Sequence, residues 1–143
     1  MRQTKEQLRA AHAWTAISTL TTESRDTQKK LAVAIKNLPV RIHASGLGQA
    51  ITFLRAKEES NKEFRLLEAI VVHWLMNNYP MKYLVTNDED DPSRRLIEKI
   101  IDGDASTLKR LTDEALAYLP WLSRFAEGAG MMKVVKKPIE QKD

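Results

Sequence analysis

Helix start and stop signals recur along this chain, and they constrain its fold more than any other feature. Thr4 is followed three residues later by Gln7, which is the pattern of a capping box. Asp91 stands before Pro92 as an N-cap stands before a proline at the first helical position. No segment has the alternation of apolar and polar residues that predicts a strand. The sequence therefore predicts an all-α fold with helices near residues 4–20, 24–44, 46–58, 61–78, 92–102 and 105–127.

A chain of 143 residues is long enough to form one domain with a core of its own. We expect a single-domain bundle of about six helices over residues 1–128, followed by a loose, basic, flexible tail over 129–143. The helix near 61–78 is apolar nearly all round, which is typical of the centre of a bundle. The last helix has an apolar stripe of Leu108, Leu111, Ala115, Leu119, Leu122 and Phe125. The residues expected to be buried include Leu31, Ile35, Val71, Leu75, Leu119 and Leu122.

The second predicted helix has two distinct faces. One face is an apolar stripe at helical spacing that runs through Pro39, so we expect the helix to bend there without ending. The opposite face has Val33 and Val40 at its centre. Two interpretations stay open: a solvated face with two stray valines, or a contact surface with an apolar centre and a basic rim. The stripe consists of Leu31, Ile35, Leu38 and Ile42, and the rim of Arg25, Lys29 and Lys36 on one side with Lys30 and Arg41 on the other.

Positive charge is concentrated in the N-terminal part of the chain. Residues 1–57 contain ten Lys or Arg against three acids, so that a net charge of +7 there is offset by −3 in residues 58–143. This asymmetry favours a polyanion or an acidic protein surface as the partner of the N-terminal part.

Candidate chemistry is missing from the sequence. There is no cysteine, and His12, His43 and His73 fall on three separate predicted helices, so we expect no metal, no other cofactor and no catalytic residue. The acidic run 87–95 has proline where a calcium loop needs glycine. The glycines in "SGLG", residues 45–48, follow no strand and precede no phosphate-binding lysine, so we expect them to join two helices at a sharp angle. Without a signal sequence or a run of about 20 apolar residues, the chain is expected to be cytoplasmic, with no membrane partner and no small-molecule ligand.

The segment from Leu38 to Lys57 carries a family resemblance. Leu38-Pro39, then Ile42, then "ASGLGQAITFLRAK" closely resembles the motif of the small helical subunit of the type III-B CRISPR effector, the Cmr RNA-targeting complex. That family commonly has Asn where this chain has Ser45, and both residues can cap a helix. Three flanking stretches are similar to its other helices, so the resemblance covers most of the chain: "QLRAAHAW" from Gln7, "VVHWL" from Val71 and "EALAYLPWLSRFAEG" from Glu114.

The resemblance implies a non-catalytic subunit that stacks in several copies into a minor filament, beside the backbone subunits that hold the guide RNA. Its partners are then further copies of itself, the backbone and large subunits, and the guide and target RNA. A basic groove between the filaments then accepts target RNA. By motif position, Lys36 and Arg41 are the first candidates for RNA contact. The other candidates are Lys29, Lys30 and Arg25, then Arg9 and Arg124, which could instead stabilise the bundle or a subunit contact, while Val33 and Val40 are the candidates for subunit contact.

Two other classes of protein remain open from the sequence. One is a helical adaptor whose basic face binds an acidic protein and no nucleic acid. The other is a divergent enzyme whose catalytic residues follow no pattern that we can identify. Salt dependence separates the adaptor from an RNA-binding protein, because release of counterions makes the affinity for RNA fall steeply as salt rises.

Overall fold

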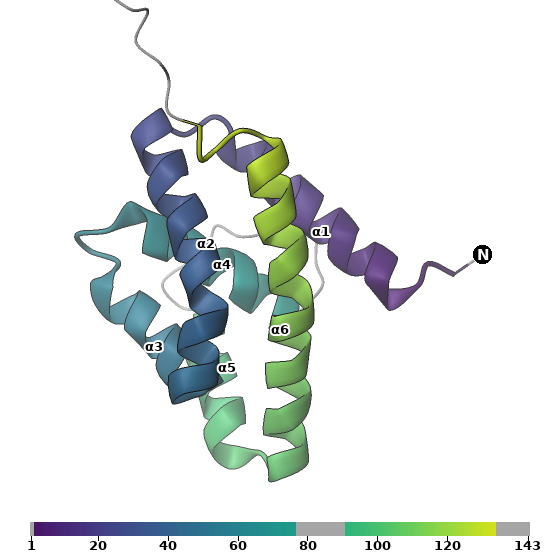
Figure 1. The fold of residues 1–143 in the computed structure, drawn as a ribbon. Helices are drawn as coiled ribbons and strands as arrows, with labels where there is room; N and C mark the ends of the chain where they lie inside the picture. The colour runs from purple at the N-terminus through teal and green to yellow at the C-terminus, as the bar shows by residue number, and fades with distance from the viewer. Residues whose placement is uncertain (1, 77–90, 134–143) are drawn as a thin grey trace, which may run out of the picture.

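The computed structural model describes residues 2–76 and 91–133, and this part of the chain is helical with no strand. The all-α prediction is therefore confirmed, and each expected helix is present (Figure 1). The helix expected over 61–78 ends its described part at Met76. The helices are α1 (Lys5–Leu20), α2 (Arg25–Ser45), α3 (Leu47–Lys57), α4 (Lys62–Met76), α5 (Pro92–Asp102) and α6 (Ala105–Gly128).

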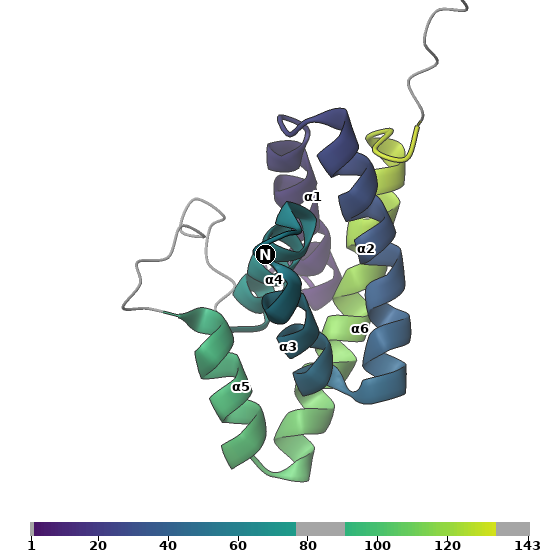
Figure 2. The same cartoon turned by 90° about the vertical axis from the view of Figure 1, so that its left-hand side faces the viewer.

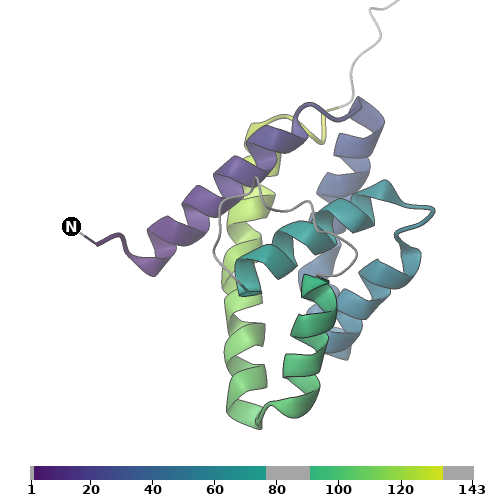
Figure 3. The ribbon, with the colours of Figure 1, turned by 180° about the vertical axis from the view of Figure 1, so that it is seen from behind.

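The bundle is built around the long helices α2 and α6, which lie side by side and run in opposite directions (Figure 1). Seen from behind, α1 and α4 cross this pair obliquely, with α1 packed along α6 (Figure 3). Helix α4 contacts α2, α3, α5 and α6, which confirms its predicted central position. Helices α3 and α5 complete the bundle on the side away from α1 (Figure 2). Helix α2 therefore keeps one long face on the outside.

Local capping explains where the helices begin. The Thr4 hydroxyl accepts a hydrogen bond from the Gln7 backbone N–H at 3.1 Å, and the Gln7 side chain accepts one from the Thr4 N–H at 2.8 Å. This is the predicted capping box. The Asp91 carboxylate accepts a hydrogen bond from the Arg94 N–H at 3.2 Å, at the start of α5. Both signals act within one turn of helix, which is why the sequence was enough to find them.

Neither internal proline ends its helix. Pro39 lies inside α2 and Pro120 lies inside α6, and both helices continue beyond them. Proline removes one backbone hydrogen bond from a helix, so continuation requires tertiary packing on either side of it. In α2 that packing comes from Leu38 and Ile42, each 2 % exposed.

Gly46 forms the joint between α2 and α3. Its backbone has φ 86° and ψ 161°, a conformation that only glycine adopts without strain, and its N–H donates to the Ile42 carbonyl at 2.8 Å. The sharp turn that the sequence predicts here is confirmed. The role expected of the second glycine is wrong, because Gly48 lies within α3 and has no positive φ.

We expect the Gly46→Ala variant to lower the free energy of unfolding by about 1 to 2 kcal/mol, because a Cβ strains this conformation. Gly48→Ala is the matched control. Its Cβ would meet Ile100 at an ordinary 3.6 Å, and alanine favours a helix over glycine by about 1 kcal/mol, so it should be neutral or stabilising. Chemical denaturation of both variants checks the prediction, and equal effects would contradict it.

The core contains most of the residues predicted from helical spacing. Leu31, Ile35, Val71, Leu119 and Leu122 are each at most 1 % exposed, and Leu75 is partly buried against them. The whole stripe of α2 is buried, as predicted. The predicted buried stripe of α6 is wrong at one end. Leu108 is 38 % exposed, because the first turns of α6 extend beyond the end of α2 (Figure 1).

The core also extends past residue 128, where the bundle was expected to end. Met131 is 1 % exposed and belongs to the core cluster, and its N–H donates to the Ala126 carbonyl at 3.1 Å. Residues 134–143, the rest of the predicted tail, lie outside the described residues, as do residues 87–90 of the acidic run 87–95.

Candidate nucleic-acid interface

The outward face of α2 is exposed along its length. Val33 is 41 % exposed and Val40 is 68 % exposed, while the apolar stripe on the opposite face of the same helix is buried. The lysines of the predicted rim and Arg25 are exposed, and Arg41 is half-buried. The structure therefore places the predicted rim and its apolar centre on one accessible surface. Some of its basic residues lie on the side of α2 that faces α3 and α4, and the others lie on the side that faces α6.

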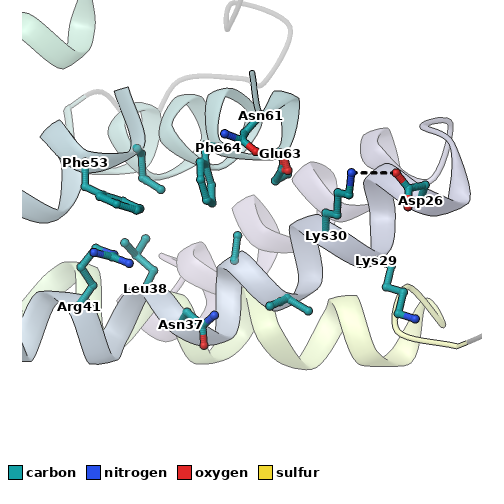
Figure 4. Close-up of a pocket in the computed structure, with 13 residues that line it drawn as sticks. Asp26, Lys29, Lys30, Asn37, Leu38, Arg41, Phe53, Asn61, Glu63 and Phe64 are labelled. Carbon is teal, nitrogen blue, oxygen red and sulfur yellow. Dashed lines mark ion pairs between the residues drawn. The ribbon is translucent and has the colours of Figure 1, made fainter. Parts of the chain in front are cut away.

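A groove of about 500 Å³ separates this face of α2 from α3 and the start of α4 (Figure 4). Four predicted site residues lie along it: Lys29, Lys30, Val33 and Arg41. The opposite wall brings in aromatic side chains that the sequence analysis did not identify, Phe53 from α3 and Phe64 from α4.

Arg41 stacks on an aromatic ring at one end of this groove. Its guanidinium carbon lies 3.4 Å from the centroid of the Phe53 ring, within the range of a cation–π interaction. The rings of Phe53 and Phe64 are 5.7 Å apart and tilted by 58°. The planar guanidinium is thus held over the Phe53 ring, although the two residues are on different helices.

The lysines at the other end of the groove differ in their surroundings. The Lys30 ammonium lies 3.1 Å from an Asp26 carboxylate oxygen one turn earlier, and this hydrogen bond raises the pKa of Lys30. Lys29 forms no ion pair with any residue that the structure describes, and the same holds for Arg41. An exposed ion pair such as that of Lys30 with Asp26 contributes little free energy, so Lys30 remains available to bind an anionic ligand.

On its other side, the face of α2 borders the end of α6. The Lys36 ammonium lies 3.5 Å from a carboxylate oxygen of Glu127, whose other oxygen lies 4.0 Å from Arg124. Arg25 donates a long hydrogen bond, 3.5 Å, to the Gly130 carbonyl. Lys36 and Arg124 therefore share one carboxylate, and Arg25 contacts the backbone just beyond α6. Sequence spacing does not reveal these contacts, because they join α2 to the end of α6.

Arg9 lies on α1, away from α2, and is engaged within the bundle. Its guanidinium donates to both carboxylate oxygens of Glu114 on α6, at 2.6 and 2.9 Å, and to Glu6 at 3.2 Å. The hydrogen bond with Glu114 raises the pKa of Arg9. The Trp74 indole also donates to Glu114, at 3.0 Å. These contacts match the alternative that the sequence left open for Arg9, stabilisation of the bundle.

Two histidines that the sequence places on separate helices meet in the core. His12 on α1 lies 2.9 Å from His73 on α4 through their ring nitrogens, and its other nitrogen lies 2.6 Å from the Tyr118 hydroxyl. Burial, and then the nearby His73, lower the pKa of His12 to about 4. His43 is exposed on α2. The pair was missed because residues 61 positions apart carry no local signal of their contact.

Two kinds of feature are absent from the described ranges, residues 2–76 and 91–133. No group of three or more His, Cys, Asp or Glu side chains is placed to hold a metal ion. None of the helices there combines the length and the apolar character needed to cross a bilayer.

Comparison with known proteins identifies the family of the chain. Residues 5–129 match the family model of the CRISPR-associated protein Cas_Cmr5. The fold is similar to the crystal structure of a CRISPR-associated Cmr5 family protein from Thermus thermophilus, with a TM-score of 0.65 and 22 % sequence identity over 90 % of this chain and 98 % of that one. At that identity the structural likeness shows a shared fold, and the family match covers most of the chain. The chain therefore belongs to the Cmr5 family and is a small subunit of a type III-B Cmr complex.

Proposed function

We propose that this subunit stacks in several copies as a minor filament of the Cmr complex and that the outward face of α2 contacts target RNA there. The observation that carries the proposal is the accessible row of basic side chains on α2, which includes Lys29 and Arg41 without carboxylate partners in the described residues. The subunit itself is non-catalytic in this proposal. Its partners are further copies of the chain, the backbone and large subunits, and the guide and target RNA, in the cytoplasm.

The chemistry of the face suits binding without sequence readout. Lysine and arginine side chains that contact phosphates give affinity that does not depend on the bases. Lys36 and Arg124 share the Glu127 carboxylate. If one of them binds a phosphate instead, Glu127 keeps its ion pair with the other. Such a face is appropriate in a complex whose sequence specificity comes from guide pairing.

The exposed valines support a protein contact within the same proposal. Val40 is 68 % exposed and Val33 is 41 % exposed, and both lie between the basic rims. Apolar side chains at the centre of a polar surface are typical of protein interfaces. We assign Val33 and Val40 to contact with another subunit, and the basic rims to RNA.

A triple variant, Lys29→Ala with Lys36→Ala and Arg41→Ala, tests the RNA contact. If each side chain neutralises one phosphate, the slope of log affinity against log salt for target RNA should fall by about 2, since each contact on a single strand contributes about 0.7. The measurement is the affinity of the assembled complex for target RNA over a range of salt concentrations. The fold should persist, because exposed substitutions usually change stability by about 0.5 kcal/mol or less.

A matched control removes two lysines and one arginine elsewhere: Lys99, Lys109 and Arg94, all exposed on α5 and α6. This control should leave affinity and salt slope unchanged. If the α2 variant also leaves both unchanged in a properly assembled complex, the face does not contact RNA, and the adaptor interpretation takes its place.

A further inference from the structure

The groove between α2, α3 and α4 has a floor of a different chemical character from its rim. The floor is apolar and aromatic, and is formed by Ala34, Leu38, Leu54, Phe53 and Phe64. The rim has Lys29 and Lys30 at one end and Arg41 at the other (Figure 4). Lys29 and Arg41 are twelve residues apart, about 18 Å along a helix, which a short stretch of single-stranded RNA can span.

Two carboxylates line the groove: Asp26 is paired with Lys30 at the rim, and Glu63 limits what can enter the floor. Glu63, at the start of α4, lines the groove beside Asn61 and is 6 % exposed. A phosphate in the floor would be repelled by this carboxylate and would lose its hydration against apolar side chains. An uncharged, flat group meets neither penalty, so the groove suits a ligand that is anionic at the rim and neutral in the floor.

We propose that this groove holds one base of single-stranded RNA, stacked on the guanidinium of Arg41, while phosphates on either side contact the lysines. The inference rests on the proposed function and adds to it a contact with a base. The guanidinium carbon of Arg41 lies 3.4 Å from the Phe53 ring centroid, so one face of the guanidinium is supported by the ring. Bases stack on arginine planes and on aromatic rings, and such stacking tolerates any sequence because every base has a π face.

The test uses the purified full chain and a short single-stranded RNA with 2-aminopurine at one position, titrated at several salt concentrations from about 50 mM upward. Binding to the wild-type protein should change the 2-aminopurine fluorescence as the base stacks. Arg41→Lys keeps the charge but removes the plane, and Phe53→Leu keeps an apolar side chain but removes the ring. Each should weaken binding by about 5-fold or more and reduce the fluorescence change, with the salt slope unchanged.

Arg94→Lys is the matched control, because it makes the same change at an exposed arginine on α5, away from the groove, and should leave affinity and fluorescence unchanged. Circular dichroism establishes that each variant is folded. Equal behaviour of Arg41→Lys, Phe53→Leu and the control overturns the inference, and so does a reduced salt slope for Arg41→Lys.

Failure of this inference is distinguishable from failure of the proposed function. If the wild-type chain does not bind the RNA at low salt, the base site is wrong, whereas the proposed function is wrong only if the triple variant on α2 leaves target binding by the complex unchanged. If Phe53→Leu leaves RNA binding intact but prevents incorporation into the complex, the groove binds a protein and the base site is again wrong.

Discussion

Replacing Leu119 with alanine is expected to lower the free energy of unfolding by about 3 kcal/mol, the largest effect of any single change considered for this protein. Leu119 is 1 % exposed in the middle of α6, the helix that contacts α1, α2 and α4. Truncation loses the burial of the removed carbons and leaves a cavity that helices on three sides cannot close without shifting. A decrease of roughly 10 °C in the midpoint of thermal unfolding should accompany it.

Leu108→Ala in the same helix is the control for this prediction. Leu108 is 38 % exposed, so the same change of side chain should cost less than about 1 kcal/mol. Denaturant titration of the two variants gives the comparison. Similar losses in both would mean that the packing around α6 differs from the structure described above.

Acidification is expected to destabilise the folded chain through His12 by about 2 kcal/mol between pH 8 and pH 5. The ordinary pKa of histidine is 6.5, and burial together with His73 lowers the pKa of His12 in the folded state to about 4. As pH falls below about 6.5, His12 binds a proton in the unfolded chain but stays neutral in the folded chain. The stability that neutral His12 contributes to the folded state is therefore fully present above about pH 6.5 and is lost progressively as pH falls toward 4.

A second buried group acts in the opposite direction. Burial, with a hydrogen bond to Glu58, raises the pKa of Glu68 to about 7, so the folded state binds this proton first and gains stability as pH falls from 7 toward 4.5. The pH dependence of the wild-type protein alone mixes the two groups. The effect of His12 has to be measured as a difference between the wild-type protein and a variant.

The variant His12→Gln provides that difference. It should be less stable than the wild-type protein at pH 8, because the hydrogen bonds with Tyr118 and His73 are disturbed, and the gap should be about 2 kcal/mol smaller at pH 5. Urea unfolding at the two pH values measures the gap. His43→Gln is the control, because His43 is exposed and meets similar solvent in both states. A gap for His12→Gln that is the same at pH 5 and pH 8 would contradict the prediction.

The candidate site was predictable where its residues share one helix. The spacing of Leu31, Ile35, Leu38 and Ile42 fixed which face of α2 is buried, so Val33 and Val40 had to be on the opposite face. What lies next to that face was not predictable. The sequence did not single out Phe53 and Phe64, because an aromatic residue on a helix usually packs in the core. Their position along a groove depends on where the neighbouring helix lies.

The sequence alone specifies the helix caps, the joint at Gly46 and the buried stripes, apart from Leu108 at the start of the α6 stripe. Thr4, Asp91 and Gly46 act on backbone groups within a turn of their own positions, and an apolar repeat identifies the buried side of a helix whatever covers it. Arg9 pairs with Glu114, His12 meets His73 and Arg41 rests on Phe53 because of how the helices pack against one another. Each of these contacts joins two helices, and whether the side chains meet depends on the angle and offset at which those helices cross. The whole packed core sets that angle and offset, and no local stretch of sequence encodes them.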